Sequence, residues 1–159
     1  MTQHQTRFGG VDIAESQNWT CAEPLGGFDD LRTFALLHVA EQGPFLWLQS
    51  LEVPDLAFLL VDAGCFGLRF AGVDASEDAP PCVMVIVPRS PGEVLRVHRL
   101  APLFFDPEAG TFTQQVFEPD QVLGDGRWRD EAAHAPRGAW ASRVVEIQPA
   151  GQRSEASLA

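Results

Sequence analysis

The chain has 159 residues, 45% of them hydrophobic and 21% charged, which suffices for one globular domain whose core needs no metal or disulfide. Its formal net charge is -11, and all 11 basic residues are arginine. A surface this acidic repels nucleic acid and anionic membranes and attracts basic partners. We therefore expect no direct binding to nucleic acid or membranes.

Cysteine usage and the N-terminus indicate a reduced, cytoplasmic protein. The 3 cysteines are too widely spaced for a disulfide framework or for the close ligand pairs of a metal site. No apolar run approaches the roughly 20 residues that span a bilayer, and the polar stretch Met1–Gly10 does not resemble a signal peptide. We expect no metal, no other cofactor and a cytoplasmic location.

The predicted elements of the first half are mainly β-strands. Thr6–Ile13 alternates apolar and polar residues, which predicts a half-buried strand. Phe28–Arg32 is expected to form a short helical turn, and Phe34–Val39 a strand. Phe45–Leu51 and Leu56–Val61 are almost continuously apolar. That pattern predicts burial on both faces, or strands of a closed barrel with a further element packed outside.

The second half continues with strands and then becomes polar. Cys65–Ala71, Cys82–Val87 and Val94–Phe105 are predicted strands, the last bent by Pro102, and Thr111–Phe117 returns to complete a hairpin. Residues 1–118 are therefore expected to form a single small antiparallel β-barrel-like domain with little helix. Residues 119–159 are expected to be a polar C-terminal extension, partly disordered, in which residues 144–147 can form one extra strand.

The sequence offers no motif for catalysis. It contains no nucleophile elbow, no glycine-rich phosphate loop and no metal-protease helix. Cys65 lies between Gly64 and Phe66, and such a cysteine is interpreted as an inert core thiol. Trp128 lies between two arginines, and either a partner-binding anchor or a residue folded onto the barrel fits that pattern. We expect a protein that is not an enzyme.

The segment Pro44–Phe58 is the most distinctive part of the chain. Its large apolar residues are interpreted as barrel core: Phe45, Trp47, Leu48, Leu56 and Phe58. Its polar residues lie at the corner between two strands, where polar groups can face outward, and they are the candidate partner-binding residues: Gln49, Ser50, Glu52 and Asp55. Asp55 has an alternative role, which is to hold the turn after Pro54 by bonding backbone amides.

Several segments, in this order, resemble the family of bacterial flagellar assembly factors called FliW: Thr6–Gly9, Leu25–Leu37, Pro44–Phe58, Val85–Pro88 and Leu100–Leu103. The resemblance implies a β-barrel-like fold without catalysis. It also implies a regulator that binds flagellin and antagonises CsrA, an RNA-binding repressor of flagellin translation. Such a protein would act as a chaperone-like regulator of flagellum biogenesis, and we expect a monomer when no partner is bound.

The chain departs from that family in its later part. The acidic segment after the second buried strand is reduced to Asp74–Asp78, and the late hairpin turn Glu108–Gly110 is acidic rather than basic. Residues 118–159 lie largely outside the resemblance, and the chain has no tyrosine. The alternative function is an acidic β-barrel binding module or chaperone for another secretion or assembly client. A source genome that lacks both flagellin and CsrA would favour this alternative.

Overall fold

Strands dominate the fold of this chain. The computed structural model describes residues 1–73, 80–87, 90–129 and 138–148. Among these residues, helix is confined to the short segments η1 (Glu15–Gln17), η2 (Ala63–Phe66), η3 (Pro119–Gln121) and α1 (Gly138–Ser142). No helix in these described ranges is long and apolar enough to cross a membrane.

A closed 7-stranded β-barrel forms the centre of the molecule, which confirms the predicted fold class. Neighbouring strands are antiparallel around the barrel except at one junction, where the parallel pair β11–β3 closes it through Thr111↔Thr20 and Phe112↔Cys21. The barrel strands, in order, are β3 (Asn18–Cys21), β4 (Thr33–Val39), β5 (Leu46–Ser50), β6 (Ala57–Asp62), β8 (Cys82–Ile86), β10 (Leu103–Asp106) and β11 (Thr111–Gln114).

The central strands are buried on both faces, as their continuous apolar sequences predict. On β4, Leu36 belongs to the barrel interior and Leu37 to an outer apolar layer, and both are 0% exposed. On β6, Leu60 and Val61 divide between the interior and a second outer layer in the same way. Since neighbouring side chains of a strand point to opposite faces, such residues must be covered on the outside as well.

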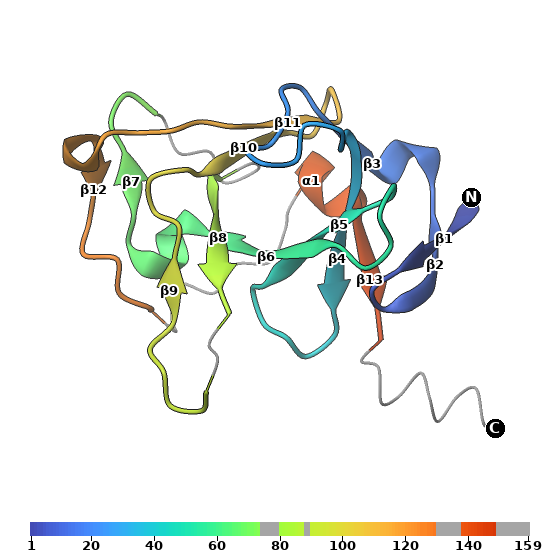
Figure 1. Ribbon diagram of the computed structural model, residues 1–159, viewed down its shortest axis with the longest axis horizontal. Coiled ribbons are helices and arrows are strands. Elements are labelled where there is room, and N and C mark those ends of the chain that lie inside the picture. Colours follow the sequence, from blue (N-terminus) through green and yellow to red (C-terminus); the bar gives the residue numbers. More distant parts are fainter. Residues whose placement is uncertain (74–79, 88–89, 130–137, 149–159) are drawn as a thin grey trace.

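A hairpin of β1 (Thr2–Thr6) and β2 (Gly9–Ile13) covers the outer face of β4 and β5. Figure 1 shows this hairpin at one end of the molecule. The expectation of one continuous strand across Thr6–Ile13 is wrong, because the chain reverses at Arg7 and Phe8. Gly9 has a φ of 93°, and the Thr6 hydroxyl donates to the Gly9 carbonyl at 2.8 Å. A glycine tolerates that backbone at no steric cost.

At the other end of the molecule (Figure 1), the outer face of β6 and β8 is covered by η2 and by three short strands: β7 (Arg69–Phe70), β9 (Arg96–Val97) and β12 (Val122–Leu123). The predicted strand over Cys65–Ala71 is therefore wrong in its first half. The Asp62 side chain accepts from the Gly64 amide at 2.7 Å and starts the helical turn. Gly67 ends it in the left-handed region with a φ of 65°.

Two further expectations need correction. Val94–Phe105 divides into β9 and β10, because the chain turns after His98, whose amide donates to the Met84 carbonyl at 2.9 Å. Phe28–Arg32 forms part of two consecutive turns instead of a helical turn. The Phe28 amide donates to the Leu25 carbonyl at 2.9 Å, and the Leu31 amide donates to the Phe28 carbonyl at 3.2 Å. The predicted hairpin of β10 and β11 is confirmed. Asp74–Asp78 lies outside the described residues.

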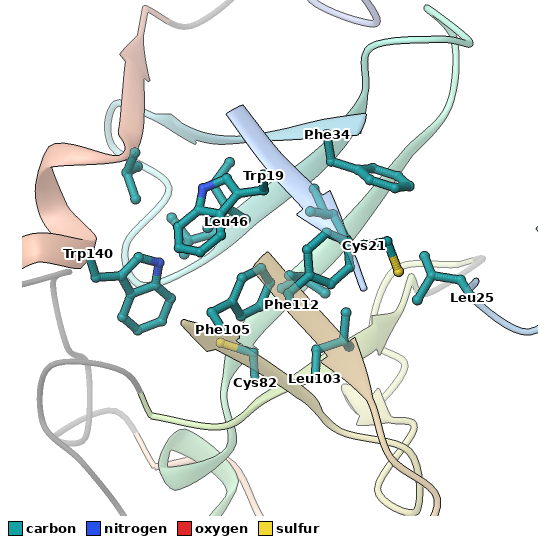
Figure 2. Packing of buried hydrophobic residues seen from close by; sticks show 14 of the residues in the cluster. Trp19, Cys21, Leu25, Phe34, Leu46, Cys82, Leu103, Phe105, Phe112 and Trp140 are labelled. Atoms are coloured by element: carbon teal, nitrogen blue, oxygen red, sulfur yellow. The ribbon is translucent and has the colours of Figure 1, made fainter. Parts of the chain in front are cut away.

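The last described elements pack on the barrel. After α1, β13 (Val144–Ile147) pairs in parallel with the second half of β4. Trp140 of α1 is only 4% exposed, and its ring stacks on Phe105 with the centroids 6.0 Å apart. Figure 2 shows Trp140 facing the aromatic interior of the barrel, near Trp19, Phe105 and Phe112. Trp140 and Val144 thus belong to the same cluster as the barrel strands.

Candidate partner-binding surface

The four polar residues expected at the corner between β5 and β6 occupy two different environments. Gln49 and Ser50, at the end of β5, are 0% exposed, so the expectation that they face outward is wrong. Glu52 and Asp55, in the following turn, are exposed as expected. The buried pair therefore holds the backbone of the corner in place, whereas the exposed pair can contact another molecule.

Gln49 bonds the corner to the N-terminal hairpin. Its side-chain amide donates to the carbonyls of Ser50 at 2.8 Å and Pro54 at 2.9 Å. It also lies 3.2 Å from the Leu56 carbonyl. Its carbonyl oxygen accepts from the Arg7 amide at 3.1 Å. A buried amide is tolerated when its donors and acceptor are satisfied, and here that requirement fixes the path of residues 50–56.

Ser50 shapes the start of the turn. Its hydroxyl oxygen accepts from the backbone amides of Glu52 at 3.1 Å and Val53 at 2.9 Å. A serine that bonds amides two and three residues ahead stabilises a tight turn locally. The Ser50 amide in turn donates to the Leu56 carbonyl at 2.9 Å, which closes the corner.

Glu52 joins the corner to the loop before β4. One of its carboxylate oxygens accepts from the amides of Arg32 at 2.6 Å and Thr33 at 2.8 Å. These bonds, first that to Thr33 and then that to Arg32, lower the pKa of Glu52. The Leu51 amide also donates to the Thr33 carbonyl at 3.0 Å. The loop and the corner therefore form one continuous surface.

The loop contributes residues that the sequence did not identify as part of a site. Phe28 is 36% exposed, and its ring contacts Phe58 edge-on with the centroids 5.2 Å apart. Asp29 and Asp30 beside it are exposed. Local sequence does not place these residues beside the corner, because their nearness to it depends on the pairing of Phe34 with Ser50 across β4 and β5.

We name six exposed residues of the loop and the corner the acidic rim: Phe28, Asp29, Asp30, Glu52, Val53 and Asp55. The exposed Arg32 lies in the same loop, so the carboxylates of the rim are accompanied by one cation. Val53 is 42% exposed, so the rim combines apolar side chains with carboxylates. Such a surface suits a protein segment that is cationic and partly apolar. Within the described ranges no group of three or more histidine, cysteine or acidic side chains is arranged to hold a metal ion.

Other side chains that could react or bind a partner are buried or packed against the barrel. The three cysteines are buried, and burial raises the pKa of Cys82 and of Cys21, which keeps both as thiols. Trp128 stacks on Phe45 with the ring centroids 5.4 Å apart and contacts Phe66 at the same distance. Of the two interpretations of Trp128, the structure supports a residue folded onto the barrel.

These features define a class of protein: a closed β-barrel, covered on two sides, with an acidic rim at the β5–β6 corner. The family model described as FliW protein matches residues 2–124. The chain therefore belongs to the FliW family. It is 32% identical to the flagellar assembly factor FliW of Syntrophotalea carbinolica, over 73% of this chain and 89% of that protein.

Two further comparisons agree with this assignment. The flagellar assembly factor FliW of Geotalea uraniireducens is 34% identical, over 73% of this chain and 77% of that protein. A crystal structure of the flagellar assembly factor FliW superposes with a TM-score of 0.62 and covers 83% of this chain and 100% of that chain. At 19% sequence identity, the superposition supports the fold.

Proposed function

We propose that this chain is a non-enzymatic regulator of flagellum assembly that binds flagellin and antagonises a CsrA-like translational repressor in the cytoplasm. Membership of the FliW family supports the link to flagellar assembly. The acidic rim carries the proposal, because it presents exposed carboxylates and the exposed side chains of Phe28 and Val53 on a corner held by Gln49 and Glu52.

Charge explains how such a protein would oppose an RNA-binding repressor. With a net charge of -11, the chain attracts a basic surface over the Debye length of about 10 Å at 0.1 M salt. Once docked on a repressor, it repels the phosphate backbone of RNA in addition to covering surface. Release of the repressor from the messenger RNA then follows from electrostatics as well as from steric exclusion.

The direct test mixes the purified full chain with flagellin and, separately, with CsrA from the same organism at micromolar concentration. We expect a complex with each partner in size-exclusion chromatography and a monomeric chain when it is run alone. If neither complex forms, the proposal fails, and a different secretion or assembly client becomes the better assignment. Calorimetry on any complex then provides its dissociation constant.

Charge reversal tests whether the acidic rim is the contact surface. The double variant Asp29→Lys, Asp30→Lys should weaken binding by about five- to thirtyfold, the factor for a loss of ~1–2 kcal/mol from two exposed charges. The control matched in charge is the double variant Glu118→Lys, Asp120→Lys, at two exposed acidic residues of the η3 turn outside the rim. Affinity of the unaltered chain should also fall as salt rises toward 1 M. Equal weakening by control and rim variants would exclude the rim.

A further inference from the structure

The C-terminal strand β13 is attached to the barrel along one edge of β4. Its four residues pair in register with β4 from Val144↔Leu36 to Ile147↔Val39, and the Ala40 amide donates to the Ile147 carbonyl at 2.9 Å. Val145 and Ile147 belong to the outer apolar layer beneath the N-terminal hairpin. The position of β13 therefore affects how that hairpin is supported.

One polar contact joins the two strands. Glu146 of β13 lies opposite His38 of β4 in the register. The Nδ1 atom of His38 lies 2.8 Å and 3.0 Å from the two carboxylate oxygens of Glu146. The Nε2 atom of the same ring lies 2.7 Å from the carbonyl oxygen of Gly43, in the turn between β4 and β5.

Both acceptors require a proton on the imidazole nitrogen that faces them. A carboxylate and a carbonyl oxygen cannot donate, and a neutral imidazole carries only one N–H. Both bonds therefore form together only when the ring is an imidazolium. In that state His38 connects β13, through Glu146, to the β4–β5 turn, through Gly43.

The charged groups around His38 leave Glu146 as its main partner. The β4–β5 turn carries Glu41, which is exposed, and β5 contributes no charged residue, since it reads Leu-Trp-Leu-Gln-Ser. Arg143, which precedes β13, turns away, and its guanidinium donates to the carbonyls of Ser16 at 2.6 Å and Asn18 at 3.3 Å. On β13 itself, Glu146 is the charged residue.

We propose that His38 is a protonation-controlled clasp that holds the C-terminal strand β13 on the barrel. When the ring loses its proton, one of its two bonds is lost and the charge attraction to Glu146 disappears. β13 then opens more often along its edge with β4, and the apolar layer that it shares with the hairpin is exposed more often. The clasp acts within the chain and requires neither of the partners proposed above.

The direction of the pH dependence follows from the environment of the ring. Burial, the largest single effect, lowers the pKa of His38, but the hydrogen bonds to Glu146 and Gly43 and the attraction to Glu146 together outweigh it. The pKa of His38 is therefore raised above 6.5. A raised pKa in the folded state means that the stabilisation is complete below about pH 6.5, the unfolded value. It is lost as the pH rises through the folded value.

Hydrogen exchange on the full chain, read by mass spectrometry, tests the clasp. After correction for the intrinsic exchange rate, protection of residues 140–148 should fall about two- to fivefold as the pH rises through the His38 titration, the factor for a partly exposed pair. Protection of β8 should not change over the same range. Protection of residues 140–148 that stays constant while His38 titrates would overturn the proposal.

A nuclear magnetic resonance titration of the His38 ring provides the second measurement. Glu146→Gln keeps the shape of an exposed side chain and should move the His38 midpoint to a lower pH. The same variant should remove the pH dependence of exchange in residues 140–148. The control, Glu41→Gln in the adjacent turn, should leave the midpoint unchanged. Equal midpoints in the unaltered chain and in Glu146→Gln would refute the clasp.

Discussion

Replacement of Gln49 by alanine is the sharpest test of how the β5–β6 corner is held. The side chain is 0% exposed and makes its bonds at the junction of the corner with the N-terminal hairpin. Alanine removes the bond that Gln49 makes with the Arg7 amide and those that it makes with the Ser50 and Pro54 carbonyls. The Leu56 carbonyl keeps its bond from the Ser50 amide, so it is not left without a partner.

The magnitude follows from those three groups. An unsatisfied buried donor or acceptor costs about 1–3 kcal/mol, and Arg7 and Pro54 lie near the surface, where water reaches part of the vacated space. We therefore expect Gln49→Ala to lower the free energy of unfolding by about 2–4 kcal/mol. Gln49→Glu should be at least as damaging at neutral pH, because a carboxylate cannot donate to the carbonyls of Ser50 and Pro54.

Urea denaturation followed by tryptophan fluorescence measures the change. Gln115→Ala is the matched control, since Gln115 is an exposed glutamine on the same chain, and it should change the stability by less than about 0.5 kcal/mol. A loss below about 1 kcal/mol for Gln49→Ala would refute the reasoning. It would mean that the bonds of the buried amide are replaced by water at little cost.

Two other substitutions test the core and the rim. Trp140→Ala should lower the free energy of unfolding by about 3–5 kcal/mol, because a 4% exposed ring stacked on Phe105 is removed. Its control is Val116→Ala, at an 83% exposed position. Equal, small losses of stability in the two variants would contradict the packing of Trp140. Glu52→Gln should lower the free energy of unfolding at neutral pH. The difference in stability between this variant and the unaltered chain should narrow as the pH falls below about 4.5. The pKa of Glu52 is lowered by its bonds to Thr33 and Arg32, so its stabilisation is lost as acid protonates it. Urea midpoints of the two proteins at neutral and acidic pH measure this difference in stability. A difference that does not change with pH would contradict the role given to the Glu52 carboxylate.

Much of the barrel was predictable from local sequence. The strands β4, β5, β6 and β8 were expected where they occur, because a continuous apolar run must be buried on both faces. Several short strands at close spacing, without amphipathic helices, indicated a small antiparallel barrel. The errors fell at reversals. A period-2 pattern continues unchanged through a two-residue turn, so Thr6–Ile13 was interpreted as one strand instead of a hairpin.

The candidate site was predictable only in part. Glu52 and Asp55 were placed correctly on the surface, because they follow a strand in a turn that contains proline. Gln49 and Ser50 were expected outside, since polarity usually indicates exposure. Here the partners of both side chains are backbone groups, those of Gln49 in residues 7, 50, 54 and 56. Backbone partners leave no signature in the residue types.

The sequence by itself determined the mainly β class, the family resemblance and the acidic charge, since each depends on composition or on local order. Only the tertiary structure decided which segments meet. It brought Phe28 beside the corner, Trp140 into the barrel interior and Glu146 opposite His38. These contacts join residues from about 30 to 108 positions apart in the chain. Local propensity cannot specify such pairs, because they depend on strand register and on how the barrel closes.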